Sequence, residues 1–252
     1  METKSIKRRN EVVKMLTEEK ELKTSTLANY FGVSTETIRK DLLILQEIGV
    51  IQKLHGKAHL LITGTDTPID IRTYQRQTEK LLIAQKALEM IENNTLIYID
   101  GGSTTLEIAK LLTQKEGLVV ITTSLIAAGI IAKQKNTVYV ASGFVEGSTM
   151  IITGPYIIES IKRFMPVISF MGTNGVRNHT GPTSKDYHDI DVKNEIVKNS
   201  TTSVVVCDSS KFHESGILQY ANWGDIDYLI TDSDIPAESK EDIEKSTRII
   251  IA

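Results

Sequence analysis

One stretch of the chain combines glycines with hydroxyl side chains in a pattern that could bind a phosphate. Asp100-Gly101-Gly102-Ser103-Thr104-Thr105 follows the apolar run Leu96–Ile99 and precedes a helical pattern. Glycines let a backbone approach an anion, and a helix N-terminus offers free N–H groups and a favourable dipole. The stretch is neither a Walker loop nor a dinucleotide fingerprint. A tight strand-to-helix turn, with Ser103 or Thr104 as its cap, explains it equally well.

Similar polar segments follow four further apolar runs. They are Thr122-Thr123-Ser124, Ser142-Gly143, Gly172-Thr173-Asn174-Gly175 and Asp208-Ser209-Ser210-Lys211-Phe212. Each of them alone is explained as well by a helix cap or a turn. In parallel sheets, however, ligands bind at the carboxyl ends of the strands. Five polar strand ends on one edge of a sheet therefore indicate a binding pocket.

The elements that would position these segments alternate between strand and helix. The predicted strands are Leu96–Ile99, Leu118–Ile121, Val138–Ala141, Val167–Met171, Ser203–Cys207, Tyr228–Ile230 and Arg248–Ile251. The predicted helices are Thr104–Thr113, Leu125–Lys135, Pro155–Phe164, Asp189–Ser200 and Ala237–Lys245. Short, continuously apolar strands between amphipathic helices predict an α/β domain with a mostly parallel sheet covered on both faces. We assign this domain to residues 95–252.

A second region that could do chemistry lies near the N-terminus. Ser34 is a good N-cap for a helix that starts at Thr35, because its hydroxyl can accept a first-turn N–H. The apolar residues of this helix recur at helical spacing and are Ile38, Leu42, Leu45 and Ile48. The other face offers Thr35, Thr37, Arg39 and Lys40. Hydroxyls and cations hold DNA phosphates, and an Arg can pair with a guanine edge, so this helix suits a major groove. The alternative is an ordinary surface helix with Glu36 and Lys40 as an ion pair.

The neighbouring segments favour DNA binding. A helix over Ile6–Leu16 and a short one over Leu27–Phe31, ending at Gly32, complete a helix-turn-helix order. Gly49 is expected to end the recognition helix, and Val50–Leu54 and Ala58–Leu61 form a hairpin with a basic tip, which is typical of a wing. Residues 1–62 hold 11 Lys and Arg against 8 Asp and Glu, whereas the remaining residues hold 18 against 24. A basic head on an acidic body fits a DNA contact confined to the head.

The organisation is therefore a winged helix-turn-helix domain over residues 1–62 and a linker with a bracing helix over residues 63–94. The linker is Thr63-Gly64-Thr65-Asp66-Thr67 with Pro68, and the polar helix runs from about Ile71 to Ile91. We expect DNA contacts from the first domain. Their candidate residues are Ser34, Thr35, Thr37, Arg39, Lys40, Lys53, His55 and Lys57.

The N-terminal residues resemble a known family. Arg9, Val13 and Leu16, followed by the run from Ser34 to Leu42, look like the signature of the DeoR family of bacterial transcriptional regulators. His55-Gly56-Lys57-Ala58 resembles that family's wing, although a second Gly is more usual where Lys57 stands. The resemblance implies a regulator that binds double-stranded operator DNA.

The body resembles the sensor domain of the same family, which is similar in fold to ribose-5-phosphate isomerase and glucosamine-6-phosphate deaminase. The resemblance implies a pocket for a phosphorylated sugar, with Lys193 and Lys211 as cations that face the ligand. The implied effector-binding residues are Asp100, Gly102, Ser103, Thr104, Thr105, Thr123, Ser124, Gly143, Gly172, Lys193 and Lys211. The family usually has Asn where Thr123 stands and often Asp where Asn174 stands, so these departures bear on the identity of the ligand.

Composition narrows the remaining possibilities. Cys207 is the only cysteine, so no intrachain disulfide can form, and we interpret it as a buried strand thiol. His179, His188 and His213 lack metal-ligand spacing, so we expect no metal and no cofactor. The first ten residues lack the apolar core of a signal peptide, and no apolar run is long enough to span a bilayer. We therefore expect a cytoplasmic protein without a membrane partner.

Three function hypotheses belong to different classes. The leading one is a sequence-specific DNA-binding regulator, a repressor of a sugar-metabolism operon, which a phosphorylated sugar controls. It requires a homodimer or a higher even oligomer, because one small head reads few base pairs. The alternative is a sugar-phosphate isomerase or deaminase-like enzyme with a DNA-binding head. Gly172-Thr173-Asn174-Gly175 lacks the carboxylates of isomerases with a similar fold, which leaves Asp100 and Asp208 as possible bases. A third is a DNA-binding scaffold with a vestigial pocket.

Overall fold

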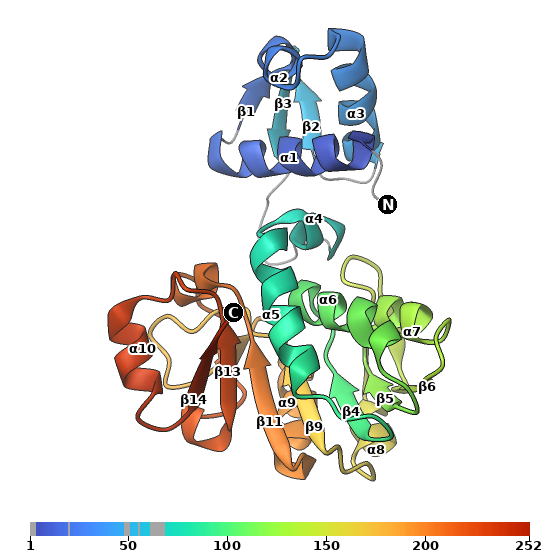
Figure 1. Ribbon diagram of the computed structural model, residues 1–252, viewed down its shortest axis with the longest axis vertical. Helices are drawn as coiled ribbons and strands as arrows, with labels where there is room; N and C mark the ends of the chain where they lie inside the picture. The colour runs from blue at the N-terminus through green and yellow to red at the C-terminus, as the bar shows by residue number, and fades with distance from the viewer. Residues whose placement is uncertain (1–3, 20, 48–50, 55, 61–68) are drawn as a thin grey trace. The chain divides into compact units, whose positions relative to one another are not determined.

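The chain divides into two compact units, and the boundary in the sequence lies between Gln77 and Thr78. The computed structural model describes residues 4–19, 21–47, 51–54, 56–60 and 69–252 (Figure 1). The first unit contains a small helical domain with a three-stranded sheet. The second contains a seven-stranded sheet with helices on both faces.

The first unit has the element order predicted for a winged helix-turn-helix domain. Its elements are α1 (Lys4–Glu19), β1 (Glu21–Lys23), α2 (Thr24–Phe31), α3 (Thr35–Glu47), β2 (Ile51–Leu54), β3 (Lys57–Leu60) and α4 (Ile69–Tyr74). Strands β2 and β3 form the expected hairpin. Strand β1, which pairs with β3, was not predicted, because three residues carry no periodic signal. The predicted end of α3 at Gly49 lies outside the described residues.

The turn between α2 and α3 follows from two residues. Gly32 has φ 61°, a left-handed conformation that glycine adopts without steric cost, and it ends α2. The Thr37 N–H then donates to Ser34 Oγ at 3.1 Å, which confirms the predicted N-cap of α3. Together they fix how the recognition helix leaves the preceding helix.

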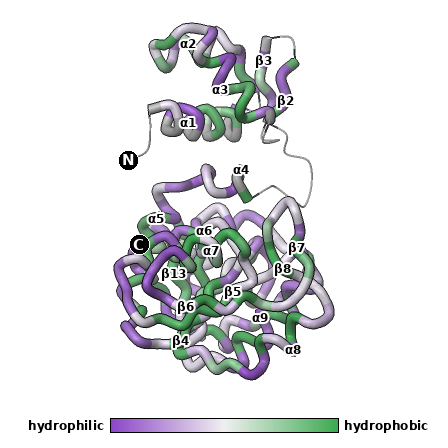
Figure 2. The backbone as a smooth tube through the Cα atoms, turned by 90° about the vertical axis from the view of Figure 1, so that its right-hand side faces the viewer, coloured by the Kyte–Doolittle hydropathy of each residue, from purple (hydrophilic) through white to green (hydrophobic). Residues whose placement is uncertain are grey.

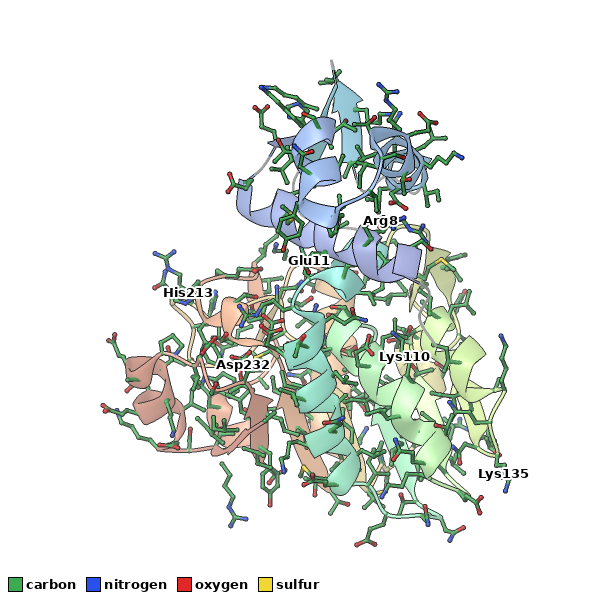
Figure 3. The ribbon with its side chains drawn as sticks, turned by 45° about the horizontal axis from the view of Figure 1, so that its top comes forward. Arg8, Glu11, Lys110, Lys135, His213 and Asp232 are labelled. Atoms are coloured by element: carbon green, nitrogen blue, oxygen red, sulfur yellow. The ribbon has the colours of Figure 1, made fainter. Side chains whose placement is uncertain are left out.

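The core of the first unit is apolar and borders a buried carboxylate. Its buried residues are Val12, Val13, Leu16, Leu27, Ala28, Ile38, Leu42, Leu45, Ile51 and Ala58. Asp41 on α3 is buried and forms ion pairs with Arg8 and Arg9 of α1. Figure 3 labels Arg8 on α1. Because a buried carboxylate needs a partner, this contact holds α3 against α1.

The predicted single helix from Ile71 to Ile91 is wrong. The structure has two helices, α4 and α5 (Gln77–Glu89), with a break at Gln75 and Arg76. Arg76 has φ 50°, and a left-handed residue cannot continue a right-handed helix. Tyr74 of α4 packs on the core of the first unit, whereas Ile83 of α5 belongs to the core of the second.

The second unit contains all seven predicted strands in one parallel sheet. They are β4 (Leu96–Ile99), β5 (Val119–Thr122), β6 (Thr137–Val140), β9 (Ile168–Met171), β11 (Thr202–Val206), β13 (Tyr228–Thr231) and β14 (Arg248–Ile251). Their order is β14-β13-β11-β9-β4-β5-β6, and every pairing is parallel. The predicted fold class is confirmed.

Helices cover both faces of this sheet (Figure 1). They are α6 (Ser103–Leu111), α7 (Leu125–Ile131), α8 (Ile157–Ile161), α9 (Tyr187–Asn199) and α10 (Ala237–Ile243). Ile97 and Ile99 of β4 pack with α5, α6 and α7, whereas Tyr98 packs with α8, α9 and α10. This alternation explains why the strands are apolar throughout. Pro155 is not the first residue of α8, which begins at Ile157. In the described ranges, no helix is long and apolar enough to cross a membrane.

Two short hairpin-like pairs lie near the carboxyl ends of the strands and were not predicted. Strand β7 (Phe144–Glu146) pairs with β8 (Ile151–Thr153), and β10 (Thr183–Ser184) pairs with β12 (Leu218–Gln219). The Ile152 N–H donates to the Thr123 carbonyl at 2.8 Å, which ties β8 to the loop after β5. Both pairs therefore lie at the edge of the sheet from which the polar segments emerge.

Candidate functional site

The head presents its predicted DNA-binding residues on α3 and the wing. Thr35, Arg39 and Lys40 are exposed on α3. The expected Glu36–Lys40 pair is not formed; Arg39 Nη1 instead lies 3.5 Å from Glu36 Oε2. Both partners are about two-thirds exposed, so this contact is weak and Arg39 is free to exchange it for DNA. Thr37 Oγ1 lies 2.9 Å from Ser34 Oγ, so these two hydroxyls bond to each other at the helix start.

Lys57, on strand β3 of the wing, lies beside β1. Lys57 Nζ donates to Glu21 Oε1 at 2.7 Å, and this hydrogen bond lowers the pKa of Glu21. Lys53 is partly exposed on β2, and His55 lies outside the described residues. The tip is tied to α2, because Thr24 N–H and Thr24 Oγ1 both donate to the Gly56 carbonyl at 3.0 Å. The wing is therefore held against the helix-turn-helix.

The polar ends of β4 and β9 lie where the order of the strands along the sheet reverses. From β4 the chain proceeds to β5 and β6 on one side, while β9, β11, β13 and β14 lie on the other. The carboxyl ends of β4 and β9 thus form the topological switch point, where α/β sheets bind ligands. Asp100 follows β4 and Gly172 follows β9, and the Gly172 N–H donates to Asp100 Oδ2 at 2.9 Å.

A buried ammonium joins these two strand ends to α9. Lys193 Nζ lies 3.1 Å from Asp100 Oδ2 and 2.8 Å from Asp189 Oδ2, and it donates to the Gly172 carbonyl at 3.1 Å. An ammonium has three donors, so these three oxygens occupy all of them. The ring of Tyr220 lies 5.1 Å from Nζ, and the Tyr220 hydroxyl donates to the same Gly172 carbonyl at 3.0 Å.

The charges of this cluster depend on one another. Burial alone would lower the pKa of Lys193, but the Asp100 and Asp189 carboxylates outweigh it and raise that pKa. Burial raises the pKa of Asp100, and the Lys193 ammonium opposes that rise. Lys193 is therefore held charged, and it stabilises two carboxylates in a site with little water.

The N-terminus of α6 differs from this saturated cluster. The first helical bond runs from the Leu106 N–H to the Gly102 carbonyl, so the amides before Leu106 have no partner within the helix. Ser103 and Thr104 are each only 8% exposed, and neither hydroxyl bonds to another group in the described part of the chain. Neither oxygen is among the fully buried atoms that lack a partner, so both hydroxyls reach solvent. The Thr105 hydroxyl is used differently, because it donates to the Asp100 carbonyl at 2.7 Å. Accessible hydroxyls beside free helix amides are the kind of donors that suit an anion.

Two glycines of the predicted pocket have packing roles. A Cβ at Gly101 would lie 2.6 Å from Ile151 Cγ1, so this glycine admits the β8 side chain over the loop. A Cβ at Gly143 would lie 2.1 Å from the Thr153 carbonyl oxygen. Both glycines therefore allow the β7–β8 hairpin to close against the strand ends.

Comparison with known proteins assigns both units. Residues 75–233 match the family model described as the DeoR C terminal sensor domain, and residues 8–63 match the DeoR-like helix-turn-helix domain. The chain belongs to the DeoR family. It is a DNA-binding transcriptional regulator whose helix-turn-helix domain is joined to a sensor domain.

Relatives of this DeoR-family chain match along nearly its whole length. The glycerol-3-phosphate regulon repressor of Escherichia coli (strain K12) is 28% identical over 92% of this chain and 93% of its own. The HTH-type transcriptional regulator GlpR of Haloferax volcanii is 27% identical over 95% of this chain and 94% of its own. Ribose 5-phosphate isomerase A of Methanocaldococcus jannaschii, a solved structure, has a TM-score of 0.41 and 16% identity, covering 54% of this chain and 55% of that one.

The structure brings some predicted residues of the DeoR sensor pocket together and separates others. Asp100, Gly172 and Lys193 are in direct contact. Thr123 Oγ1 lies 3.5 Å from the buried Tyr98 hydroxyl, and Ser124 Oγ caps α7 by accepting the Ala127 N–H at 3.1 Å. Four more predicted residues lie at the N-terminus of α6, and they are Gly102, Ser103, Thr104 and Thr105.

Lys211 does not join the Lys193 cluster. It lies in the short 3-10 helix after β11, and its Nζ donates to Glu214 Oε2 at 2.9 Å. Strand β9 separates β11 from β4 in the sheet. Lys211 is thus held by a partly exposed partner, on the far side of β9 from the α6 loop.

Asp189 was missed by sequence reasoning. By its sequence alone, the acidic run Asp186, Asp189, Asp191 and Glu195 predicts a helix start and a solvated face. The helix start is right, because Asp186 Oδ1 accepts the His188 N–H. Asp189 is not solvated: it pairs with Lys193 and accepts the Ser184 hydroxyl at 2.7 Å. Its i,i+4 spacing from Lys193 was the available signal. Within the described residues, no cluster of three or more His, Cys, Asp or Glu is placed to hold a metal.

We predict that Lys193→Met strongly destabilises the body and makes its stability depend on pH. Two buried carboxylates would lose their cation, which costs about 3–5 kcal/mol. Without the ammonium the folded pKa of Asp100 rises further above its unfolded value. A group shifted in this direction contributes stability at low pH and loses it as pH rises through the folded pKa. Urea unfolding should therefore show a larger deficit at pH 7.5 than at pH 5.

The control for this prediction is Lys211→Met, which breaks a partly exposed pair and should cost less than about 1 kcal/mol. Equal losses for the two variants, or a Lys193→Met deficit that grows at low pH, would contradict the account of the cluster.

Proposed function

We propose that this protein is a repressor of a sugar-metabolism operon and that a phosphorylated sugar or related metabolite controls it by binding at the N-terminus of α6. The observation that carries this proposal is the pair of hydroxyls of Ser103 and Thr104, which have no partner in the described chain, reach solvent and lie beside free helix amides. A phosphate would supply acceptors for both kinds of donor. The name of the E. coli relative refers to glycerol 3-phosphate, which belongs to the same chemical class.

In this proposal Lys193 positions the pocket, and α6 contacts the phosphate. All three donors of Lys193 already have acceptors, so a direct bond to the ligand would break one of these contacts. Lys211 is better placed to exchange partners, because its contact with Glu214 is partly exposed. The hydroxyls of Thr123 and Ser124 and the backbone at Gly172 are proposed to line the sugar side of the pocket.

The regulator would work by a population shift. A ligand changes DNA affinity only if it binds the DNA-competent and DNA-incompetent states unequally, and the operator must then have the reciprocal effect. We propose that the protein acts in the cytoplasm as a homodimer or a higher even oligomer. Two heads can match two half-sites of an operator, whereas one head reads too few base pairs.

We also propose that the protein has no sugar-phosphate isomerase activity. Both carboxylates that sequence reasoning left as possible bases already accept hydrogen bonds. Asp100 Oδ2 accepts from Gly172 and Lys193, and Asp208 Oδ1 accepts from the Ser210 N–H and hydroxyl. Incubation with pentose and hexose phosphates should show binding without turnover; formation of an isomer or release of ammonia would favour the enzyme.

The proposed DNA contact predicts a base-specific loss for Arg39→Ala. If Arg39 pairs with a base edge, the variant should lose about 1–3 kcal/mol of operator affinity and discriminate less at one position. Fluorescence anisotropy with operator and scrambled DNA measures both. Lys245→Ala removes an equally exposed cation from the body and serves as the control. Unchanged operator affinity for Arg39→Ala would remove α3 from the DNA interface.

The proposed effector site predicts that Ser103→Glu makes the repressor insensitive to its effector. The carboxylate would occupy the place of the phosphate, and the helix should survive because an acidic residue is favourable in a first turn. Operator affinity should therefore persist while triose, pentose and hexose phosphates that release the wild-type protein no longer do so. Thr113→Glu, at an exposed position near the other end of α6, should respond normally. A Ser103→Glu protein that binds DNA and still releases it at the wild-type ligand concentration would place the pocket elsewhere.

A further inference from the structure

Strand β6 leaves one side of the body sheet open. It is the last strand of the sheet and pairs with β5 alone among the described strands. The Thr137 N–H donates to the carbonyl of Leu118, just before β5, at 2.9 Å, and the Ala141 N–H donates to the carbonyl of Thr122 in β5 at 3.1 Å. Because backbone groups alternate along a parallel ladder, the N–H groups of Val138 and Val140 face away from β5. These groups are available to another strand.

The two edges of the sheet differ in charge. Strand β14, at the opposite edge, begins with Arg248 and follows the charged helix α10. Strand β6 reads Thr137-Val138-Tyr139-Val140 and carries no charge. Charged residues commonly protect an edge strand from pairing with other chains. The β6 edge lacks this protection, so its exposed side is expected to have a partner.

Apolar side chains surround the unprotected edge. The patch extends over both faces of the sheet, because Tyr139 lies on the α8 face and Val140 on the opposite one. Its members expose between 43% and 74% of their surface and are Tyr139, Val140, Phe144, Val145, Tyr156 and Met165. The Tyr139 ring lies 5.3 Å from the Phe164 ring, and the Ser142 N–H donates to Ser160 Oγ, so β6 and α8 form one surface. Figure 2 looks onto this side of the body, with β6 on the left of the body and the β7–β8 pair and α8 on the right.

We propose that the β6 edge is the surface through which two copies of this chain associate, with their β6 strands antiparallel across a two-fold axis. The proposal rests on the homodimer of the proposed function and names its interface. A strand edge is complementary to itself in the antiparallel orientation, so an identical chain fits it without a second kind of surface. The arrangement also separates like charges. Lys135 precedes β6 and points outward (Figure 3). In the antiparallel pair it would lie near the carboxyl end of the other copy's β6, away from the same lysine of that copy.

The size of the patch matches what a stable dimer needs. An aromatic side chain can bury roughly 150–250 Å², so the three partly exposed rings offer roughly 350 Å² per copy. A standard interface buries about 800 Å² per partner, and about 65% of a homodimer interface is apolar. Val140, Val145 and Met165 bring the patch to about the 500 Å² of apolar surface that these values require.

The test introduces one lysine at each edge of the sheet. Size-exclusion chromatography with light scattering is applied to the full-length wild type, Val140→Lys and the matched control Ile251→Lys on β14. The interface would contain two buried lysines in Val140→Lys, so its dissociation constant should rise about 100-fold or more, and the assembled mass should halve. Ile251→Lys should keep the wild-type mass.

The outcomes separate the two proposals. A wild type that is monomeric at every concentration overturns both the homodimer and this interface. An assembled wild type whose mass Val140→Lys does not change overturns the interface alone. A second variant keeps the test valid if Val140→Lys does not fold. Tyr139→Cys, treated with a short bismaleimide, should give covalent dimers. Cys207 is buried and should not react. Cross-linking of Ile251→Cys in place of Tyr139→Cys would assign the contact to the other edge.

Discussion

One buried ammonium joins the strand ends of the sensor domain in this DeoR-family regulator. Lys193 contacts Asp100 at the end of β4, the Gly172 carbonyl at the end of β9 and Asp189 one turn earlier on α9. Strands β4 and β9 are paired neighbours between which the connections reverse direction, so the chain leaves their ends toward opposite sides of the sheet. Because each buried charge is compensated only by the others, loss of any member leaves an unpaired charge in the core. This mutual dependence fixes the ends of β4 and β9 relative to α9.

Because the donors of Lys193 are all in use, the proposed ligand is expected to bind at the N-terminus of α6. The Lys193 ammonium has no spare donor, and the Asp100 carboxylate is held by an amide and an ammonium. By contrast, the Ser103 and Thr104 hydroxyls and the first amides of α6 have no partner in the described chain. Such a division suits recognition better than catalysis, because proton transfer needs an acid or base free to change its protonation state. A sensor needs a shaped anion site whose occupancy changes the free energy of the protein.

Much of this architecture could be predicted from the sequence, because its signals are local. Seven short apolar runs predicted the sheet, and Ser34 after Gly32 predicted the start of α3. What could not be predicted depends on contacts between distant segments. Asp189 looked like a solvated residue until the fold placed Asp100 beside Lys193. Gly101 looked like a residue that admits an anion, yet it admits Ile151 of a hairpin too short to have a sequence pattern.

We propose above all that a phosphate binds at the N-terminus of α6, next to the strand ends that Lys193 joins. Amide NMR of the wild-type protein tests it directly, by titration with triose, pentose and hexose phosphates and with the unphosphorylated form of each sugar. We predict that the ligand that releases operator DNA shifts the Ser103, Thr104 and Thr105 amide resonances and that its unphosphorylated form does not. A ligand that releases the operator and leaves these three resonances unchanged would contradict the claim.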